Sequence, residues 1–157
     1  MLLLALAGCN AGGDGANKTS PESAAPPPKA TLPSIPLSLL EKIFNEATQV
    51  DYIFYNYPFT FSKTEKPSIQ YSTRAIAEDP APLLPECRAT GRITYLIQGE
   101  IALEGDFFFT PGCTYFVFYE NQEKKYANYM TDEGIKDLND QIQQALKLRE
   151  QAQQGAQ

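Results

Sequence analysis

All eighteen Phe and Tyr residues of this chain lie between Phe44 and Tyr129. Aromatic side chains dominate the energetics of protein cores, so this central block supplies the material for one core. The first 36 residues contain no aromatic residue, and subtracting them leaves 157 − 36 = 121 residues. That length fits one compact domain and excludes a multidomain enzyme.

Six segments of the central block alternate apolar with polar residues or are rich in β-branched and aromatic residues, which predicts strands. They are residues 50–57, 68–76, 91–98, 100–109, 113–120 and 124–130. Their short connections predict antiparallel neighbours, because a parallel crossover needs a dozen or more residues.

A helix is predicted on each side of this block. Ser38–Glu41 has a capping-box pattern at the start of an apolar stripe, which predicts a helix from about Pro36 to Thr48. Thr131 can cap a last helix that frays from Glu150. The fold class is therefore α+β, with an N-terminal helix, an antiparallel meander of about six strands and a C-terminal helix.

Turn signals predict which side chains share a face of the sheet. The Pro111-Gly112 turn pairs Phe107 with Phe116, and the turn at residues 121–124 pairs Tyr119 with Tyr126. We expect one face to form a bed for a helix; it carries Ile101, Leu103, Phe107, Phe109, Phe116, Phe118, Ala127 and Tyr129. The opposite face carries Glu104, Asp106, Phe108, Tyr115, Val117, Tyr119, Tyr126 and Asn128.

This second face is neither polar nor apolar, and it holds the candidate binding residues. They are Glu104, Asp106, Phe108, Tyr115, Tyr119 and Tyr126. One interpretation is that the loop at residues 77–88, or a helix, folds over the rings. The other is an exposed tyrosine-rich contact surface, on which ring area gives affinity and hydroxyl groups give direction.

Catalytic and metal sites find little support in the sequence. The chain has no histidine, which removes His-based general-base catalysis and His-containing zinc sites. Glu104 and Asp106 alternate on one strand about 7 Å apart, a spacing more typical of a solvated strand than of a glycosidase pair. The acidic residues from Asp132 to Asp140 lack the EF-hand order. We therefore expect no enzyme, no cofactor and no metal.

The segment Leu6-Ala7-Gly8-Cys9 follows an apolar run and resembles the lipobox of bacterial lipoproteins. The resemblance covers only these first nine residues and implies that residues 1–8 are a signal segment and that Cys9 carries a lipid. The mature chain would be anchored in the bacterial cell envelope. Asn10 stands where many inner-membrane lipoproteins have Asp, which favours the outer membrane over the inner.

Residues 9–36 predict a tether, since the stretch after Cys9 holds six of the twelve prolines. The folded domain is expected at residues 37–150, followed by a disordered Gln-rich tail at 151–157. The formal net charge of −6 argues against nucleic acid as a partner.

Lipidation of Cys9 would leave Cys87 and Cys113 as an even pair in a compartment that tolerates disulfides. We expect them to be bonded; the alternative is two separate reduced thiols.

The function expected from these observations is a non-enzymatic module that holds a protein partner in the cell envelope. The alternative is a carrier that encloses a small apolar or aromatic ligand in a cleft of the sheet. Exposed rings at the candidate binding residues favour the partner, and rings that line a closed hollow favour the ligand.

Overall fold

The computed structural model describes residues 28–154, which form three helices and seven strands. Cys9, the expected signal segment and most of the expected tether lie outside these residues. The elements are α1 (Leu37–Glu46), β1 (Gln49–Phe54), β2 (Thr60–Lys63), α2 (Lys66–Arg74), β3 (Ile76–Pro80), β4 (Gly91–Ile97), β5 (Glu100–Thr110), β6 (Cys113–Glu120), β7 (Glu123–Met130) and α3 (Asp132–Gln154).

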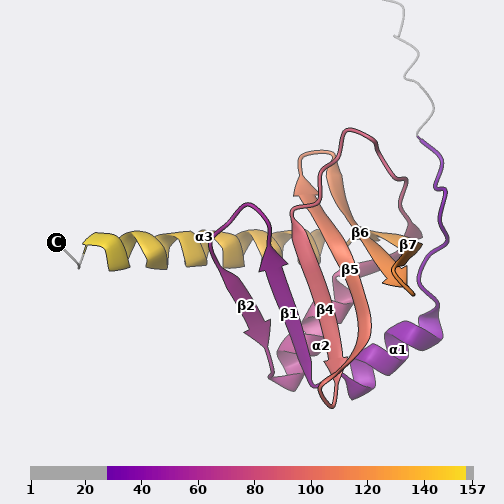
Figure 1. Cartoon of the computed structure of the whole chain (residues 1–157), viewed down its shortest axis with the longest axis horizontal. Coiled ribbons are helices and arrows are strands. Elements are labelled where there is room, and N and C mark those ends of the chain that lie inside the picture. Colours follow the sequence, from indigo (N-terminus) through magenta and orange to yellow (C-terminus); the bar gives the residue numbers. More distant parts are fainter. Residues whose placement is uncertain (1–27, 155–157) are drawn as a thin grey trace, which may run out of the picture.

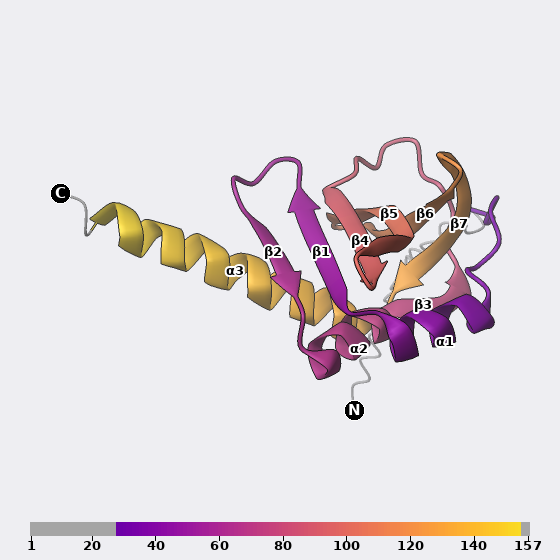
Figure 2. The ribbon, with the colours of Figure 1, turned by 60° about the horizontal axis from the view of Figure 1, so that its bottom comes forward.

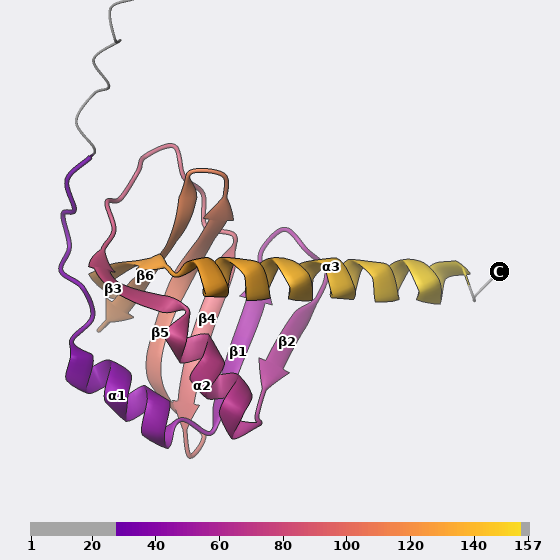
Figure 3. The same cartoon turned by 180° about the vertical axis from the view of Figure 1, so that it is seen from behind.

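The strands form one antiparallel sheet in the order β2-β1-β4-β5-β6-β7-β3, which confirms the α+β class and the β4–β7 meander. The three helices lie on one face of the sheet, behind the strands in Figure 1 and in front of them in Figure 3. α3 crosses this face and extends beyond β2, as Figure 2 also shows. No helix formed by residues 28–154 lies on the opposite face.

The two predicted helices differ in their caps. α1 begins at Leu37 and buries Leu40 and Ile43, but Ser38 lies inside the helix and the N-cap is Pro36, which has no side-chain cap. The expected capping box is therefore wrong. Thr131 does cap α3, because its Oγ1 accepts a hydrogen bond from the Gly134 amide at 3.1 Å.

The predicted strand at residues 68–76 is wrong. These residues form most of α2 and the first residue of β3. Pro67 lies in the first turn of α2, where its missing N–H costs no hydrogen bond, and Ile69, Ser72 and Thr73 are buried at helical spacing. β2 was not predicted; it pairs with β1, so the sheet has seven strands rather than six.

The predicted register holds between β5 and β6, where Phe107 pairs with Phe116. Between β6 and β7 it fails: Lys124 lies opposite Tyr119, and a bulge at Phe118/Tyr119 then places Tyr126 opposite Phe118. The slip reverses the faces of β7. Tyr126 packs against the helix-side core, and Ala127 lies on the opposite face.

Two more residues depart from the predicted helix-facing set. Ile101 is 62% exposed, since the pairing of β5 with β4 shifts beside it. Tyr129 is 42% exposed and pairs with Tyr115 on the helix-free face. The bulges, which a turn rule does not reveal, explain both corrections.

The domain is longer at both ends than predicted. Ile35 is buried, the Ala127 amide donates to the Pro33 carbonyl, and Leu32 packs on the helix-free side, so the last residues of the expected tether belong to the domain. At the other end, residues 151–154 continue α3. Their Gln and Ala residues favour the helix more than a disordered tail.

The core lies between the sheet and the helices. Its fully buried side chains include Ile43, Ile69, Tyr95, Phe107, Phe116 and Phe118. Gly105 is needed within β5, because a Cβ atom there would lie 2.5 Å from the Val117 carbonyl oxygen and 2.7 Å from the Phe118 ring. Within residues 28–154, no helix combines the length and apolar character needed to cross a membrane.

Candidate contact site on the helix-free sheet face

Directly paired residues of antiparallel strands point to the same face, so the register gives the rows of the helix-free face. One row is Ser62, Asp51, Thr94, Glu104 and Tyr119; the next is Thr60, Ile53, Arg92, Asp106, Val117 and Ala127. This face has a covered part and an uncovered part. We call the uncovered part the open half; it consists of Thr60, Ser62, Asp51, Ile53, Tyr55, Arg92, Thr94, Glu104, Asp106 and Tyr119.

The other part is covered by the connection between β3 and β4. Phe108 and Tyr115 stack with ring centroids 4.4 Å apart and are 9% and 2% exposed. Leu83 and Leu84 pack against their cluster. The covering loop was therefore the right interpretation for these two rings, which do not offer a contact surface.

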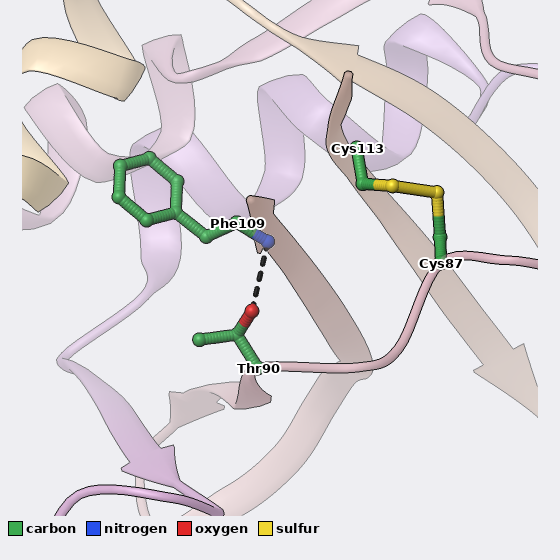
Figure 4. The surroundings of a disulfide bond; sticks show 4 residues. All are labelled: Cys87, Thr90, Phe109 and Cys113. Carbon is green, nitrogen blue, oxygen red and sulfur yellow. Dashed lines mark hydrogen bonds between the residues drawn. A yellow bond between two sulfur atoms is a disulfide. The ribbon is translucent and has the colours of Figure 1, made fainter. Parts of the chain in front are cut away.

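A disulfide holds this loop in place. Cys87 and Cys113 are bonded, with Cα atoms 5.8 Å apart, so the expected pair is confirmed. Beyond the disulfide, the Oγ1 atom of Thr90 accepts a hydrogen bond from the Phe109 amide at 2.9 Å (Figure 4). The loop is thus fastened to the first residue of β6 and, through Thr90, to β5.

Of the remaining candidates, Tyr126 does not belong to this face, because the bulge before it turns its ring toward the helices. Tyr119, Glu104 and Asp106 do lie together. The site that the structure assembles from the six candidates is therefore smaller and more polar than the predicted tyrosine-rich surface.

Asp106 is the centre of this site. The Tyr55 hydroxyl donates to its Oδ1 at 2.8 Å, and the Tyr119 hydroxyl donates to its Oδ2 at 2.7 Å. Each carboxylate oxygen thus accepts a short, charge-assisted hydrogen bond. Tyr55 follows β1 and Tyr119 is the last but one residue of β6, so the two bonds connect segments on both sides of β4 and β5.

Arg92 lies beside this carboxylate on β4. Its Nε is 3.5 Å from Asp106 Oδ1, its Nη1 is 3.8 Å from Glu104 Oε2, and its guanidinium lies 5.8 Å from the centre of the Tyr119 ring. Arg92, Glu104, Tyr119 and Gln122 line a hollow of about 390 Å³. One cation, one carboxylate, one ring and one amide therefore share a small space.

Burial, followed by the hydrogen bond to Asp106, raises the pKa of both Tyr119 and Tyr55. The charge of Asp106 acts in the same direction, since ionising either phenol would place two anions side by side. Both hydroxyls therefore stay protonated as donors well above neutral pH.

Sequence reasoning missed Tyr55, Arg92 and Gln122. Arg92 pairs directly with Asp106, so the register of the β4–β5 hairpin could have placed it on the same face. Tyr55 reaches the site from the far side of β4, and nothing in its local sequence points to Asp106.

The site combines one cation, two carboxylates and two phenols. Within residues 28–154, no cluster of three or more His, Cys, Asp or Glu side chains is arranged to hold a metal ion. Comparison of the chain with protein-family models, curated proteins and solved structures finds no match.

Proposed function

We propose that this protein is a lipid-anchored module of the bacterial cell envelope that holds a protein partner against the open half of its sheet. The proposal combines the lipobox-like segment at Cys9 with the geometry of the helix-free face. The observation that carries it is the open half itself. It presents Ile53 and Tyr55, 46% and 50% exposed, beside a charged network that is already ordered.

Two features of the open half are typical of protein interfaces. Tyrosine and arginine are enriched at interface hot spots, and here Tyr55, Tyr119 and Arg92 come together. The hydrogen bonds of Asp106 fix the two phenols before a partner arrives. Less conformational entropy is then lost on binding.

The tether supports the same proposal. A membrane anchor at Cys9 with a proline-rich segment would keep the domain near the membrane and raise the effective concentration of an envelope partner. The outer membrane is the favoured location, on the basis of Asn10.

A ligand carrier is the second candidate, favoured by one observation. An apolar groove of about 390 Å³ lies between α1, α2 and β3, with Leu37, Leu40, Phe44 and Ile76 in its lining. This groove is on the helix side, so the rings first considered for a carrier, Phe108 and Tyr115, are not part of it. It is a place where a small apolar molecule would bind.

Site-specific photocrosslinking tests the protein-partner function in the native host. A photoreactive benzoylphenylalanine replaces Ile53, which lies on the open half without contributing to the hydrogen bonds of Asp106. The matched control carries it in place of Tyr71, which is 39% exposed on α2. We expect an adduct of one discrete mass from position 53, sensitive to protease, and none of that mass from position 71.

Equal adducts from both positions, or no adduct from position 53, would contradict the proposed contact surface. An adduct that resists protease but is removed by a glycosidase would identify a glycan instead. Recovery of a small apolar molecule with the purified protein, lost on Leu40→Glu, would favour the carrier.

A further inference from the structure

The hydrogen-bonding capacity of the open half is unevenly used. Asp51 accepts two hydrogen bonds from Gln49 Nε2, at 2.8 and 2.9 Å, and one from Ser62 Oγ at 2.5 Å. Asp106 accepts one from each of two tyrosines. Both aspartates are therefore occupied within the protein and offer little to a partner.

Arg92 and Glu104 are different. Within residues 28–154, the Arg92 guanidinium makes ion pairs with Glu104 and Asp106 and interacts with the Tyr55 hydroxyl, and its Nε is buried without a hydrogen-bond partner. Glu104 likewise accepts no hydrogen bond from a described side chain, and its only ion-pair contact is Arg92 at 3.8 Å. Arginine has five donors, and an ionised carboxylate accepts on both oxygens.

The unused donors and acceptors lie side by side and border the same hollow. The side chains of Arg92 and Glu104 are 40% and 31% exposed, so both can reach a bound group. Gln122 adds an exposed amide, which both donates and accepts. Arg92 Nη1 and Glu104 Oε2 are 3.8 Å apart. A group bound here must therefore offer an acceptor to Arg92 and, close beside it, a donor to Glu104.

A carboxamide satisfies this requirement with one planar group, since it carries a carbonyl oxygen and an N–H. A free carboxylate would meet Glu104 as a like charge, and an ammonium group would meet Arg92 as one. Either would also leave one side of the hollow without its hydrogen bond, which is costly for a polar group that becomes buried.

We propose that the Arg92–Glu104 hollow binds one carboxamide group of the partner, from an Asn or Gln side chain or from the backbone, and thereby anchors the partner on the open half. This inference rests on the proposed function, because a protein partner offers carboxamides on its backbone and on its Asn and Gln side chains. Ile53 and Tyr55, on and beside the neighbouring strand β1, would contact the apolar parts of the same segment.

Small probes test the chemistry of the hollow without knowledge of the partner. The ¹⁵N-labelled protein is titrated with N-acetylglycinamide, sodium acetate, methylammonium chloride and glucose at constant ionic strength. The readouts are the Nε–H signal of Arg92 and the side-chain amide signals of Gln122. We expect N-acetylglycinamide to shift both in a saturable way, with a dissociation constant on the order of tens of millimolar for so small a ligand.

Arg92→Lys and Glu104→Gln test the assignment. Arg92→Lys keeps the charge but removes the fork of donors, and Glu104→Gln keeps the shape but removes the charge. Each should weaken amide binding, followed at Gln122, by about tenfold. The matched controls Arg88→Lys and Glu100→Gln change exposed residues outside the hollow and should leave binding unchanged.

Several results would overturn the inference. A larger response to acetate would make the hollow an anion site, and a larger response to glucose would make it a sugar site. No response to half-molar N-acetylglycinamide would overturn it too. The crosslink from position 53 separates this failure from that of the proposed function. If the adduct still forms in Arg92→Lys and Glu104→Gln with unchanged yield, the protein binds a partner on the open half, but the hollow does not anchor it.

Discussion

Tyr55 and Tyr119 should make the stability of the protein depend on pH, because their hydroxyl protons form the hydrogen bonds with Asp106. Their pKa values are raised in the folded protein, so the native state keeps protons that the unfolded chain loses near pH 10. Above that pH the unfolded state binds fewer protons, and the free energy of unfolding must fall as the pH rises. Below it, the contribution of these tyrosines is fully present.

We therefore expect the urea midpoint to decrease between pH 10 and 11.5, and the decrease to be smaller in Tyr119→Phe. Absorbance at 295 nm follows the ionisation directly. In the native protein, the phenol that Tyr119→Phe removes should titrate above pH 10. A Tyr119→Phe variant with the same pH slope as the wild type would show that this hydroxyl is not held as described.

Asn128 is the fully buried polar side chain that joins three parts of the chain. Its Oδ1 accepts from the Ile35 amide at 3.0 Å, and its Nδ2 donates to the Ala77 carbonyl at 2.8 Å, where the pairing of β3 with β7 is irregular. Asn128→Ala leaves both backbone groups without these bonds, so we expect a loss of about 2–3 kcal/mol in urea unfolding. Asn139→Ala, at an exposed position on α3, should change stability by less than about 0.5 kcal/mol.

For single residues, the sequence correctly predicted the face of the sheet on which a side chain lies wherever alternation along one strand is enough to determine it. Glu104, Asp106 and Phe108 share a face because they alternate along one strand, and the register places them as predicted. Tyr126 was misplaced because one extra residue in a bulge reverses every side chain that follows. Tyr55 could not be assigned to Asp106, since their contact depends on the order of strands across the sheet.

Among the elements, the loop that covers Phe108 and Tyr115 depends on its disulfide. The bonded cysteines are 26 positions apart in the sequence. The chain-entropy model gives about 3.5 kcal/mol of stabilisation for a disulfide that closes a segment of that length. We expect the Cys87→Ser, Cys113→Ser double variant to lose a similar amount in urea unfolding. Trypsin should also cut it faster after Arg88, an exposed residue next to the disulfide.

Reduction provides the control for this prediction. Dithiothreitol should lower the stability of the wild type to that of the double variant and should leave the variant unchanged. A double variant as stable and as protease-resistant as the wild type would show that packing of Leu83 and Leu84 alone holds the loop closed.

The two ends of α3 should differ in their contribution to stability. Leu138 and Ile142 are buried, whereas every residue from Lys147 to Gln154 is exposed, and Figure 3 shows this end beyond the sheet. Ending the chain after Lys147 should therefore change the free energy of unfolding by less than about 0.5 kcal/mol. Ending it before Ile142 removes a core side chain and should cost several kcal/mol. A large loss on the first truncation would contradict the exposed end.

The elements that were predicted correctly have strong local signals, such as the Pro-Gly turn between β5 and β6 and the Thr131 cap. The segment at residues 68–76 was misjudged because Ile, Tyr and Thr favour strands, while its helix is stabilised by burial against the sheet. β2 was missed because four residues are too short to show a period. Its partner β1 lies five residues away, across the loop that carries Tyr55.

For the whole molecule, the proposed function requires that the domain stay near its partner, and we propose that a lipid on Cys9 keeps it there. The first packed residue described is Leu32, so residues 10–31 separate it from the proposed anchor. In the proposed arrangement, these residues would join the membrane anchor to the domain that presents the open half.

Cys9→Ala tests this arrangement, because it removes the thiol that would carry the lipid and leaves the domain untouched. We expect the variant to move from the membrane fraction to the soluble fraction while its urea midpoint and its disulfide stay unchanged. Because attachment raises the effective concentration of the partner, the crosslink from position 53 should fall in the same variant without any change in the open half. A variant that remains in the membrane fraction would contradict the anchor. A crosslink of unchanged yield from the released domain would show that the open half binds its partner without the help of the tether.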